Sequence, residues 1–355
     1  MKFDLEILDN YVKEGLVNRQ KHPSLDLYIY NYTPECVFER KWDDITLQCR
    51  GLILDGEGNV IARPFVKFFN YNEVDVVIPD GVPQITTKMD GSLIIVTSYK
   101  KELIVATRGS FVSDQAPMAR EILENNYNLT YMIHSSEGHH TYLFELTGPK
   151  NRIVVNYKEN KLTLLAVITN YNGVEHNLEY YRGTAFIDVV EEYKVEWTKD
   201  VITKLQELNL PNEEGFVLKW SNGVRVKIKF ADYIKLHRII TGVNEKRIWE
   251  LMRDNENIDE LLKQVPEEFS DWIQGVVSKI GSNYMSISTE CYGFIADNKL
   301  REMSRKEAAL LILKEEKLFA PVLFELLDSK EPKSIWKLIK PKTNKYFKEN
   351  LKEEL

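Results

Sequence analysis

The chain has 355 residues, 43% of them hydrophobic and 28% charged, which is an ordinary composition for a soluble globular protein and enough length for two domains. The net charge of −7 argues against a broadly basic surface that coats nucleic acid without selectivity, but it leaves room for a local basic groove. No apolar stretch is long enough to cross a bilayer, so we expect no membrane partner. Three widely spaced cysteines, Cys36, Cys49 and Cys291, suit neither a disulfide framework nor a zinc site, and they indicate buried thiols in a cytoplasmic protein (host cytoplasm if the source is viral).

Short apolar runs bounded by turn residues dominate the first two thirds of the chain and predict β-strands. The predicted strands are Leu52–Leu54, Val74–Ile78, Leu93–Tyr99, Leu103–Thr107, Thr141–Leu146, Leu162–Thr169, Gly215–Trp220 and Val224–Phe230. Short connections predict two hairpins, one across Lys100-Lys101 and one across Ser221-Asn222-Gly223, where Asn-Gly supplies the positive φ angles of a tight turn. Helical patterns intervene at Ser113–Asn126 and near Tyr193–Leu208.

The character of the sequence changes after about Phe230, where glycine becomes sparse and apolar residues recur at helical spacing. The predicted helices are Tyr233–Ile240, Glu245–Arg253, Ile258–Gln264, Glu268–Ile280, Arg305–Glu316 and Ala320–Leu327. We therefore expect an α+β protein, with an antiparallel-sheet-rich domain over residues 1–240 followed by a mostly α-helical domain over residues 241–355.

The segment Lys88-Met89-Asp90-Gly91-Ser92 is the strongest candidate for chemistry. A lysine at the mouth of a strand can use its amine as a nucleophile and hold a nucleotide as a phosphoramidate. Gly91 has no Cβ, so the backbone there can approach a ligand closely. A plain turn explains the same five residues about as well, so the function of Lys88 depends on its neighbours.

The second hairpin supplies some of these neighbours. Side chains alternate across a strand, so Lys227 and Lys229 share one face, where they meet either solvent or an anion. Glu214 precedes the partner strand, where its carboxylate could bind Mg²⁺. Glu145 lies inside an apolar strand, where it either faces outward or is buried and paired; a buried Glu145 could accept hydrogen bonds from a ribose hydroxyl.

Further cationic side chains are expected near Lys88. The turn at Lys100-Lys101 places Arg108 opposite Leu93, close to Gly91, and Arg50 adds further positive charge together with the segment 63–70. Such a site suits adenylyl transfer, because cations, a metal ion and partial desolvation favour the neutral, nucleophilic form of a lysine, which normally titrates near about 10.4. Cationic clamps and Mg²⁺ also neutralise the charge on a transferred phosphoryl group.

The order of these motifs resembles that of the covalent nucleotidyltransferases, which include DNA ligases, RNA ligases and mRNA-capping guanylyltransferases. The motifs are Lys88-Met89-Asp90-Gly91-Ser92, Thr107-Arg108-Gly109-Ser110, Phe144-Glu145, Glu214-Gly215 and Lys227-Ile228-Lys229. Further segments look like the RNA ligase of T-even bacteriophages and its relatives: Tyr30-Asn31-Tyr32, Glu35 to Gly51, Arg63 to Glu73, and Pro149 to Val154. The resemblance implies a nucleotidyltransferase (ligase adenylylation) fold for the first domain, and it covers the helical part only in outline.

The resemblance also implies roles for individual residues, with Lys88 forming a lysyl-AMP adduct from ATP. It implies ATP contacts for Tyr30, Arg50, Lys67, Phe69, Gly91, Arg108, Glu145, Lys227 and Lys229. Within this set Glu145 would hold the ribose and the two strand lysines the phosphates. Glu214 is implied as a ligand of Mg²⁺ or Mn²⁺, and Asp259-Glu260 as the best match to an acidic pair that positions metal-bound water. The phage family has lysine at the position of Arg108 and aspartate at that of Glu260, so the geometry at both positions differs from the family's pattern.

The activity implied by the resemblance is ATP-dependent RNA ligation. Lys88 takes AMP from ATP, AMP passes to an RNA 5′-phosphate, and an RNA 3′-hydroxyl then displaces AMP and seals the strand. The expected partners are RNA ends, with tRNA repair as one setting, and we expect a monomer. One alternative is a capping guanylyltransferase or DNA ligase, which the helical C-terminal pattern disfavours. Another is a catalytically idle RNA-binding protein on the same fold, which the complete motif set disfavours.

Overall fold

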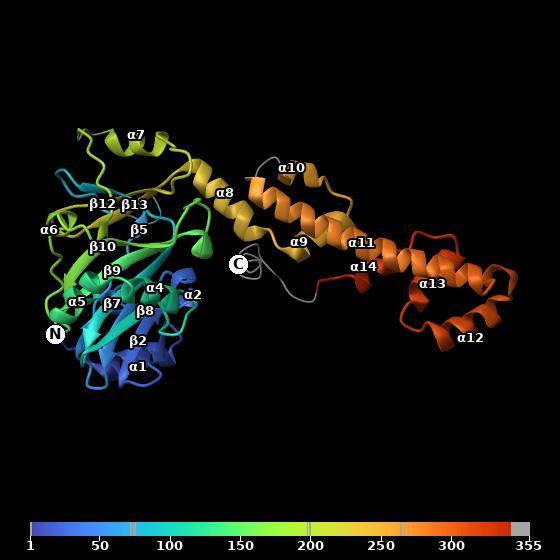
Figure 1. Cartoon of the computed structure of the whole chain (residues 1–355), viewed down its shortest axis with the longest axis horizontal. Coiled ribbons are helices and arrows are strands. Elements are labelled where there is room, and N and C mark those ends of the chain that lie inside the picture. Colours follow the sequence, from blue (N-terminus) through green and yellow to red (C-terminus); the bar gives the residue numbers. More distant parts are fainter. Residues whose placement is uncertain are drawn as a thin grey trace. The chain divides into compact units, whose positions relative to one another are not determined.

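The computed structural model describes residues 2–341 except 72, 74, 75, 197, 199, 263, 264 and 266. It divides the chain into two compact units, Met1–Ile234 and Lys235–Leu355. The first unit is rich in antiparallel sheet and the second is built from helices, so the predicted α+β fold class is confirmed (Figure 1). No helix of the described residues has both the length and the apolar character that a membrane span needs.

The N-terminal part of the chain forms the first sheet. In spatial order its strands are β1 (Val17–Lys21), β2 (Leu27–Tyr32), β3 (Arg50–Asp55) and β4 (Val60–Ala62), each antiparallel to its neighbour. The helices around it are α1 (Leu5–Lys13), α2 (Pro34–Phe38) and α3 (Asp44–Gln48). These helices begin where Asp4, Thr33 and Asp43 accept hydrogen bonds from backbone N–H groups that have no partner within the helix.

The central sheet separates two cores. In spatial order its strands are β11 (Asp188–Val189), β10 (Lys161–Thr169), β9 (His140–Thr147), β7 (Ser92–Tyr99) and β8 (Glu102–Thr107). The helical segments near it are α4 (Gln115–Glu124), α5 (Tyr127–Ser135), the short 3-10 turn Pro149–Asn151 and α6 (Glu179–Arg182). On one face Phe144 packs with Leu123 of α4, and on the other face Leu143 packs with Ile53 of the first sheet.

The third sheet carries the two lysines singled out from the sequence. In spatial order its strands are β5 (Phe69–Asn70), β13 (Arg225–Lys229), β12 (Gly215–Lys219) and β6 (Gln84–Thr87). Val226 and Ile228 are buried on one face, so Lys227 and Lys229 lie on the opposite face, as predicted. Helix α7 (Val201–Glu207) contacts β13.

A partly buried carboxylate ties the third sheet to the central one. Glu175 follows β10, to which it is joined by an isolated bridge with Ile168. Its side chain accepts hydrogen bonds from Arg225 of β13 at 2.5 Å and from Lys219 of β12. The neighbouring cations hold the pKa of Glu175 below its usual range, although burial opposes them. The two sheets are therefore joined by ion pairs at this end.

Both predicted hairpins are confirmed. Ile94 pairs with Thr107, so Leu93 and Arg108 are the next residues along the β7–β8 ladder. The turn residues Lys100 and Lys101 have φ angles of 49° and 65°, as a two-residue connection of this kind requires. In the second hairpin β12 and β13 pair from Gly215 with Lys229 to Lys219 with Arg225.

Two sequence-based assignments in this unit need correction. The predicted strand Val74–Ile78 lies partly outside the described residues, and residues 76–78 are not in a strand; Gln84–Thr87 pairs with β12 instead. The predicted helix Tyr193–Leu208 is limited to residues 201–207, because Tyr193 donates its N–H to the carbonyl of Ile85 at 2.8 Å. An apolar pattern alone does not distinguish a helix face from an extended segment lying against a sheet.

Helices make up the second unit. In chain order they are α8 (Ala231–Gly242), which contains the unit boundary, α9 (Glu245–Arg253), α10 (Ile258–Leu262), α11 (Glu267–Asp297), the 3-10 turn Leu300–Glu302, α12 (Arg305–Glu315), α13 (Ala320–Leu327) and α14 (Ser334–Leu338). Helix α11 continues well past its predicted end at Ile280, because Cys291 and Ile295 extend its apolar stripe into a core shared with Leu323 of α13. The three cysteines are buried free thiols, as predicted.

Candidate active site

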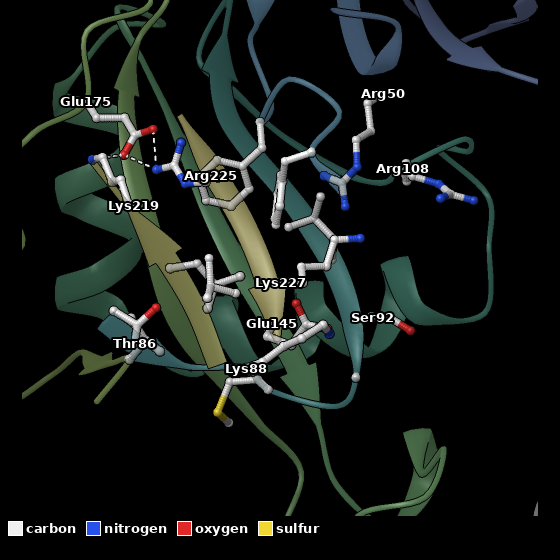
Figure 2. Close-up of a pocket in the computed structure, with 18 of the residues that line it drawn as sticks. Arg50, Thr86, Lys88, Ser92, Arg108, Glu145, Glu175, Lys219, Arg225 and Lys227 are labelled. Atoms are coloured by element: carbon white, nitrogen blue, oxygen red, sulfur yellow. Dashed lines mark hydrogen bonds and ion pairs between the residues drawn. The ribbon is translucent and has the colours of Figure 1, made fainter. Parts of the chain in front are cut away.

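A cavity of about 1100 Å³ lies between the central and third sheets (Figure 2). The third sheet contributes Thr86 and Lys227 to its wall, and the central sheet contributes Leu93 and Glu145. Further along the same face, the central sheet packs against the first sheet. The same face of the central sheet therefore packs against the first sheet at one end and lines the cavity at the other.

Lys88 lies where the chain leaves β6, and a carboxylate holds its ammonium group. Lys88 Nζ is 2.5 Å from Glu214 Oε2, and Lys229 Nζ is 2.8 Å from Glu214 Oε1, so one carboxylate bridges two lysines. Glu214 is 3% exposed, which shields these ion pairs from solvent. The Lys88 N–H donates to the Gly215 carbonyl at 2.8 Å. A Cβ at Gly215 (φ +145°) would lie 2.0 Å from the Ile228 carbonyl oxygen, so the strand that follows Glu214 has to start with glycine.

Asp90 anchors the loop that carries Lys88. Its Oδ2 accepts hydrogen bonds from the backbone N–H groups of Val154 at 2.7 Å and Val155 at 2.8 Å, and its Oδ1 accepts one from the Tyr233 hydroxyl at 2.8 Å. Asp90 is buried, and burial raises the pKa of Tyr233 above its usual range, which keeps the phenol protonated as a donor. The sequence marked Asp90 as part of a motif, but its role as an anchor depends on residues more than sixty positions away.

Glu145 reaches the cavity from β9, next to Gly91. A Cβ at position 91 would lie 2.2 Å from the Leu146 carbonyl oxygen and 3.1 Å from Glu145 Cγ, so glycine is needed for the loop to approach β9. Burial raises the pKa of Glu145 to about 7, although the Lys88 ammonium opposes the shift. Glu145 therefore changes its charge near neutral pH, and as a carboxylate it can accept hydrogen bonds from a ligand.

Lys227 lies among other cations at the same end of the cavity (Figure 2). Burial, followed by the positive charges of Lys67, Arg50 and Lys88, lowers the pKa of Lys227 to about 7. Lys227 Nζ lies 5.0 Å from the centre of the Phe68 ring, and Arg50 Cζ lies 5.5 Å from the same ring. The cations predicted from the sequence are thus gathered in one place, where an anionic ligand would relieve their repulsion.

Three aromatic rings surround the ammonium group of Lys67. Its Nζ lies 4.7 Å from the ring centre of Phe69, 5.4 Å from that of Trp42 and 5.7 Å from that of Tyr32. The Tyr32 hydroxyl also accepts a hydrogen bond from Arg108 at 3.1 Å. The sequence pointed to Lys67, Phe69 and Arg108 but not to Trp42, because no local pattern connects a tryptophan to a lysine that is distant in the chain.

Tyr30 is not among the residues that line the cavity. It is 1% exposed and packs with Phe3 and Leu8 in a core on the other side of the first sheet. Because neighbouring residues of a strand face opposite sides, Asn31 lines the cavity in its place. The structure therefore does not support the predicted contact between Tyr30 and a nucleotide.

Asp259 and Glu260 lie on α10 in the second unit, and both side chains are exposed. They occupy the first turn of this helix, where the helix dipole favours negative charge. The Asp259 N–H donates to Asn257 Oδ1 at 3.0 Å. Their part in positioning a metal ion stays a prediction.

The chain is similar to known proteins over most of its first unit. A family model described as RNA ligase matches residues 48–234, more than half of the chain. The chain belongs to this RNA ligase family. The matched range contains Lys88 and Glu145, which line the cavity, and Glu214, which pairs with Lys88.

Individual relatives extend the comparison. The RNA ligase of Rhodothermus phage RM378 is 23% identical over 78% of the chain and 80% of the phage protein. A protein of Autographa californica nuclear polyhedrosis virus, provisionally named a bifunctional polynucleotide kinase/RNA ligase, is 28% identical over 60% of the chain, and the match spans 34% of that protein. An archaeal ATP-dependent RNA ligase of known structure aligns with a TM-score of 0.52 at 13% identity, over 78% of the chain and 79% of the archaeal chain, and so shares the fold.

Proposed function

We propose that this member of the RNA ligase family is an ATP-dependent RNA ligase that joins 5′-phosphate and 3′-hydroxyl RNA ends, in RNA repair with tRNA as one candidate substrate. The observation that carries the proposal is the position of Lys88, whose Nζ lies at the cavity 2.5 Å from the shielded carboxylate of Glu214. A lysine amine, a buried carboxylate and surrounding cations are what nucleotide transfer through a lysyl-AMP adduct requires.

The first step would be attack of the Lys88 amine on the α-phosphorus of ATP. A nitrogen–phosphorus bond forms, the bond from that phosphorus to the bridging oxygen breaks, and pyrophosphate leaves with the bonding electrons. Only the neutral amine has a free electron pair for this attack, so the lysine has to lose a proton first. Glu214 Oε2, at 2.5 Å, is placed to accept that proton.

The surrounding side chains would position the nucleotide. Lys227, Arg50 and Arg108 line the cavity and supply positive charge for the phosphates, and Glu145 supplies an acceptor for a ribose hydroxyl. Arg50 and Lys227 are each held against the Phe68 ring, so their charges are partly preorganised before a ligand arrives.

The two later steps would use the same site. A 5′-phosphate oxygen of RNA attacks the phosphorus of the adduct, and the Lys88 amine leaves. The RNA 3′-hydroxyl then attacks the activated 5′-phosphate, a phosphodiester bond forms, and AMP leaves. Both steps transfer groups of high negative charge, which the cations of the cavity would stabilise.

A divalent cation, Mg²⁺ or Mn²⁺, would accompany ATP. In the part of the chain that the structure describes, no cluster of three or more His, Cys, Asp or Glu side chains could hold a metal ion. Mg²⁺, however, commonly uses one or two carboxylates, with waters and substrate phosphates as its other ligands. Glu214, with Glu145 nearby, fits this donor set. Glu214 contacts two lysines, so it would exchange one of these contacts for the metal. When bound, the ion supplies charge neutralisation at the phosphates.

Incubation with ATP labelled on the α-phosphate tests the first step. We expect covalent label on the wild-type protein, stable to alkali and labile to acid as a phosphoramidate is, and none on Lys88→Ala, because only the amine can form the adduct. Lys100→Ala, which removes a lysine from the β7–β8 turn outside the cavity, should label normally. The second measurement is sealing of a 5′-phosphate RNA, compared with DNA of the same sequence.

Several outcomes would contradict the proposal. Label from GTP in preference to ATP would favour a capping enzyme, and sealing of DNA in preference to RNA would favour a DNA ligase. Absence of label from every nucleotide in a folded wild-type protein would leave an inactive RNA-binding protein as the better description.

Replacing Trp42 with leucine should weaken ATP binding about three- to tenfold, because the ammonium group of Lys67 loses one ring of its enclosure and is held less firmly. Calorimetric titration of ATP into wild type and variant measures the change. Tyr131→Leu, at an exposed aromatic residue of α5, is the matched control and should bind ATP like the wild type. Equal affinities for Trp42→Leu and wild type would show that the aromatic enclosure does not position Lys67.

A further inference from the structure

Asn31 carries a buried acceptor without a partner at the wall of the cavity. Asn31 lines the cavity from β2, and its Nδ2 donates to the carbonyl oxygen of Tyr32 at 3.0 Å. A carbonyl oxygen can only accept, so this contact identifies the amide nitrogen and leaves Oδ1 on the other side. Among the described residues, Oδ1 has no hydrogen-bond donor.

An unpartnered donor lies on the neighbouring strand. Asn31 pairs in register with Arg50 of β3, beside an irregularity in the ladder, and Arg50 Nη1 is likewise buried without a partner among the described residues. The next residue, Gly51, has a φ of +100°, and a Cβ there would lie 2.9 Å from the Arg108 carbonyl oxygen. Glycine at position 51 therefore lets Arg50 approach the segment that carries Arg108. Buried polar groups are normally paired, so a donor and an acceptor left open on paired residues indicate a missing ligand group.

A hydroxyl group meets the needs of both atoms. Ionised phosphate oxygens accept hydrogen bonds and have no hydrogen to donate, so a triphosphate would satisfy Arg50 and leave Asn31 Oδ1 unpaired. A hydroxyl both donates and accepts, so one hydroxyl offers the hydrogen bond that each of the two atoms lacks. The proposed acceptor for the ribose of ATP is Glu145, which leaves a ribose of the RNA as the candidate for Asn31.

We propose that Asn31, together with Arg50, binds a ribose hydroxyl at the 3′ end of the RNA strand that is joined, and that Asn31 thereby discriminates RNA from DNA. This inference rests on the proposed ligase function. The 2′-hydroxyl is the group that distinguishes RNA from DNA at a given position. Arg50 would first serve the phosphates of ATP and become free for this contact when pyrophosphate has left. Because Asn31 Oδ1 is covered in the free protein, the RNA end has to displace the atoms that close over it.

Sealing of a pre-adenylylated RNA tests the inference separately from adduct formation. Two acceptor strands are compared, one ending in a ribonucleotide and one in the corresponding 2′-deoxynucleotide that keeps its 3′-hydroxyl. We expect the wild type to seal the ribose-ended acceptor about 10- to 100-fold faster. Asn31→Leu, of similar size but without the amide, should lose most of this preference by slowing the ribose-ended reaction alone. Its lysyl-AMP formation from ATP should match the wild type.

Control variants keep the test independent of folding. Asn31→Ser removes the amide with less bulk, and it should lose the same preference even if the leucine variant folds poorly. Asn18 of β1 pairs with Asn31 but is exposed and lies outside the cavity lining. Asn18→Leu should therefore leave the sealing of both acceptors unchanged. Thermal melting confirms that the variants compared are folded.

Three results would overturn the inference and leave the ligase function standing. An equal loss on both acceptors would mean that Asn31 does not read the ribose. Loss of lysyl-AMP formation in Asn31→Leu would mean that the Asn31 side chain bonds to ATP, or to a water on the metal ion, and not to the RNA end. Absence of a ribose preference in the wild type would remove the property that Asn31 is proposed to provide. A wild type that takes AMP from ATP but seals neither acceptor would overturn the ligase function itself and this inference with it.

Discussion

Replacing Glu214 with glutamine should lower the rate of lysyl-AMP formation at least a hundredfold and destabilise the first unit. Glutamine keeps the shape of the side chain but removes the charge that bridges Lys88 and Lys229 at 2.5 and 2.8 Å. The amine then loses its proton acceptor, and two ammonium groups are left close together without a counter-charge. Breaking a buried ion pair costs about 3–5 kcal/mol, and we expect about 2–3 kcal/mol here because the two lysines keep some contact with water.

Urea unfolding and labelling with ATP measure the two effects in the same preparations. Glu213→Gln is the matched control, because it changes the adjacent carboxylate, which is less deeply buried than Glu214. Adding Lys229→Met to Glu214→Gln should restore part of the stability, since one unpaired cation is removed, without restoring adduct formation. If Glu214→Gln forms the adduct at the wild-type rate, Glu214 is neither the proton acceptor nor an essential metal ligand.

The parts of this site that could be predicted from the sequence are those encoded by neighbouring residues. Strand alternation is sufficient to place Lys227 and Lys229 on one face, and the length of the Lys100-Lys101 turn is sufficient to place Arg108 opposite Leu93. The order of the motifs then indicated Lys88, Glu145 and Glu214. These inferences need only the geometry of a strand or of a hairpin, which a short segment specifies by itself.

The remaining features depend on contacts between distant segments, for which a single sequence carries little information. Trp42 reaches Lys67 only because the loop between α2 and α3 lies against the segment that enters β5. Tyr30 was expected at the nucleotide and Asn31 was overlooked, because the sequence does not say which face of β2 meets the cavity. The length of α11 was missed for a related reason: its second half is stabilised by packing against α13, whereas Gly281 interrupts the local pattern.

The second large effect concerns the dependence of stability on pH at Glu145. Its pKa is about 7 in the folded protein, raised from an ordinary value of 4.5 chiefly by burial. Below pH 4.5 the carboxyl is protonated in both folded and unfolded states, and stability does not depend on it. Between pH 4.5 and about 7 the folded state binds the extra proton, so stability falls as pH rises, and the full cost is present above pH 7. A shift of this size corresponds to about 3 kcal/mol.

Glu145→Gln should therefore unfold at the same urea concentration as the wild type at pH 4, and should become more stable than the wild type by up to about 3 kcal/mol at pH 8. The comparison of the two proteins at each pH cancels the titration of all other carboxylates. Lys227→Met is the mirror control: the pKa of Lys227 is lowered to about 7, so removing this lysine should stabilise the protein most below pH 7, and the gain should fade as pH rises. A pH-independent difference between Glu145→Gln and wild type would mean that Glu145 has an ordinary pKa.

The expected gain in stability would come with weaker binding of ATP, because a glutamine offers one acceptor oxygen where the carboxylate offers two. Glu145 is then a residue kept for ligand binding at a cost to the folded state.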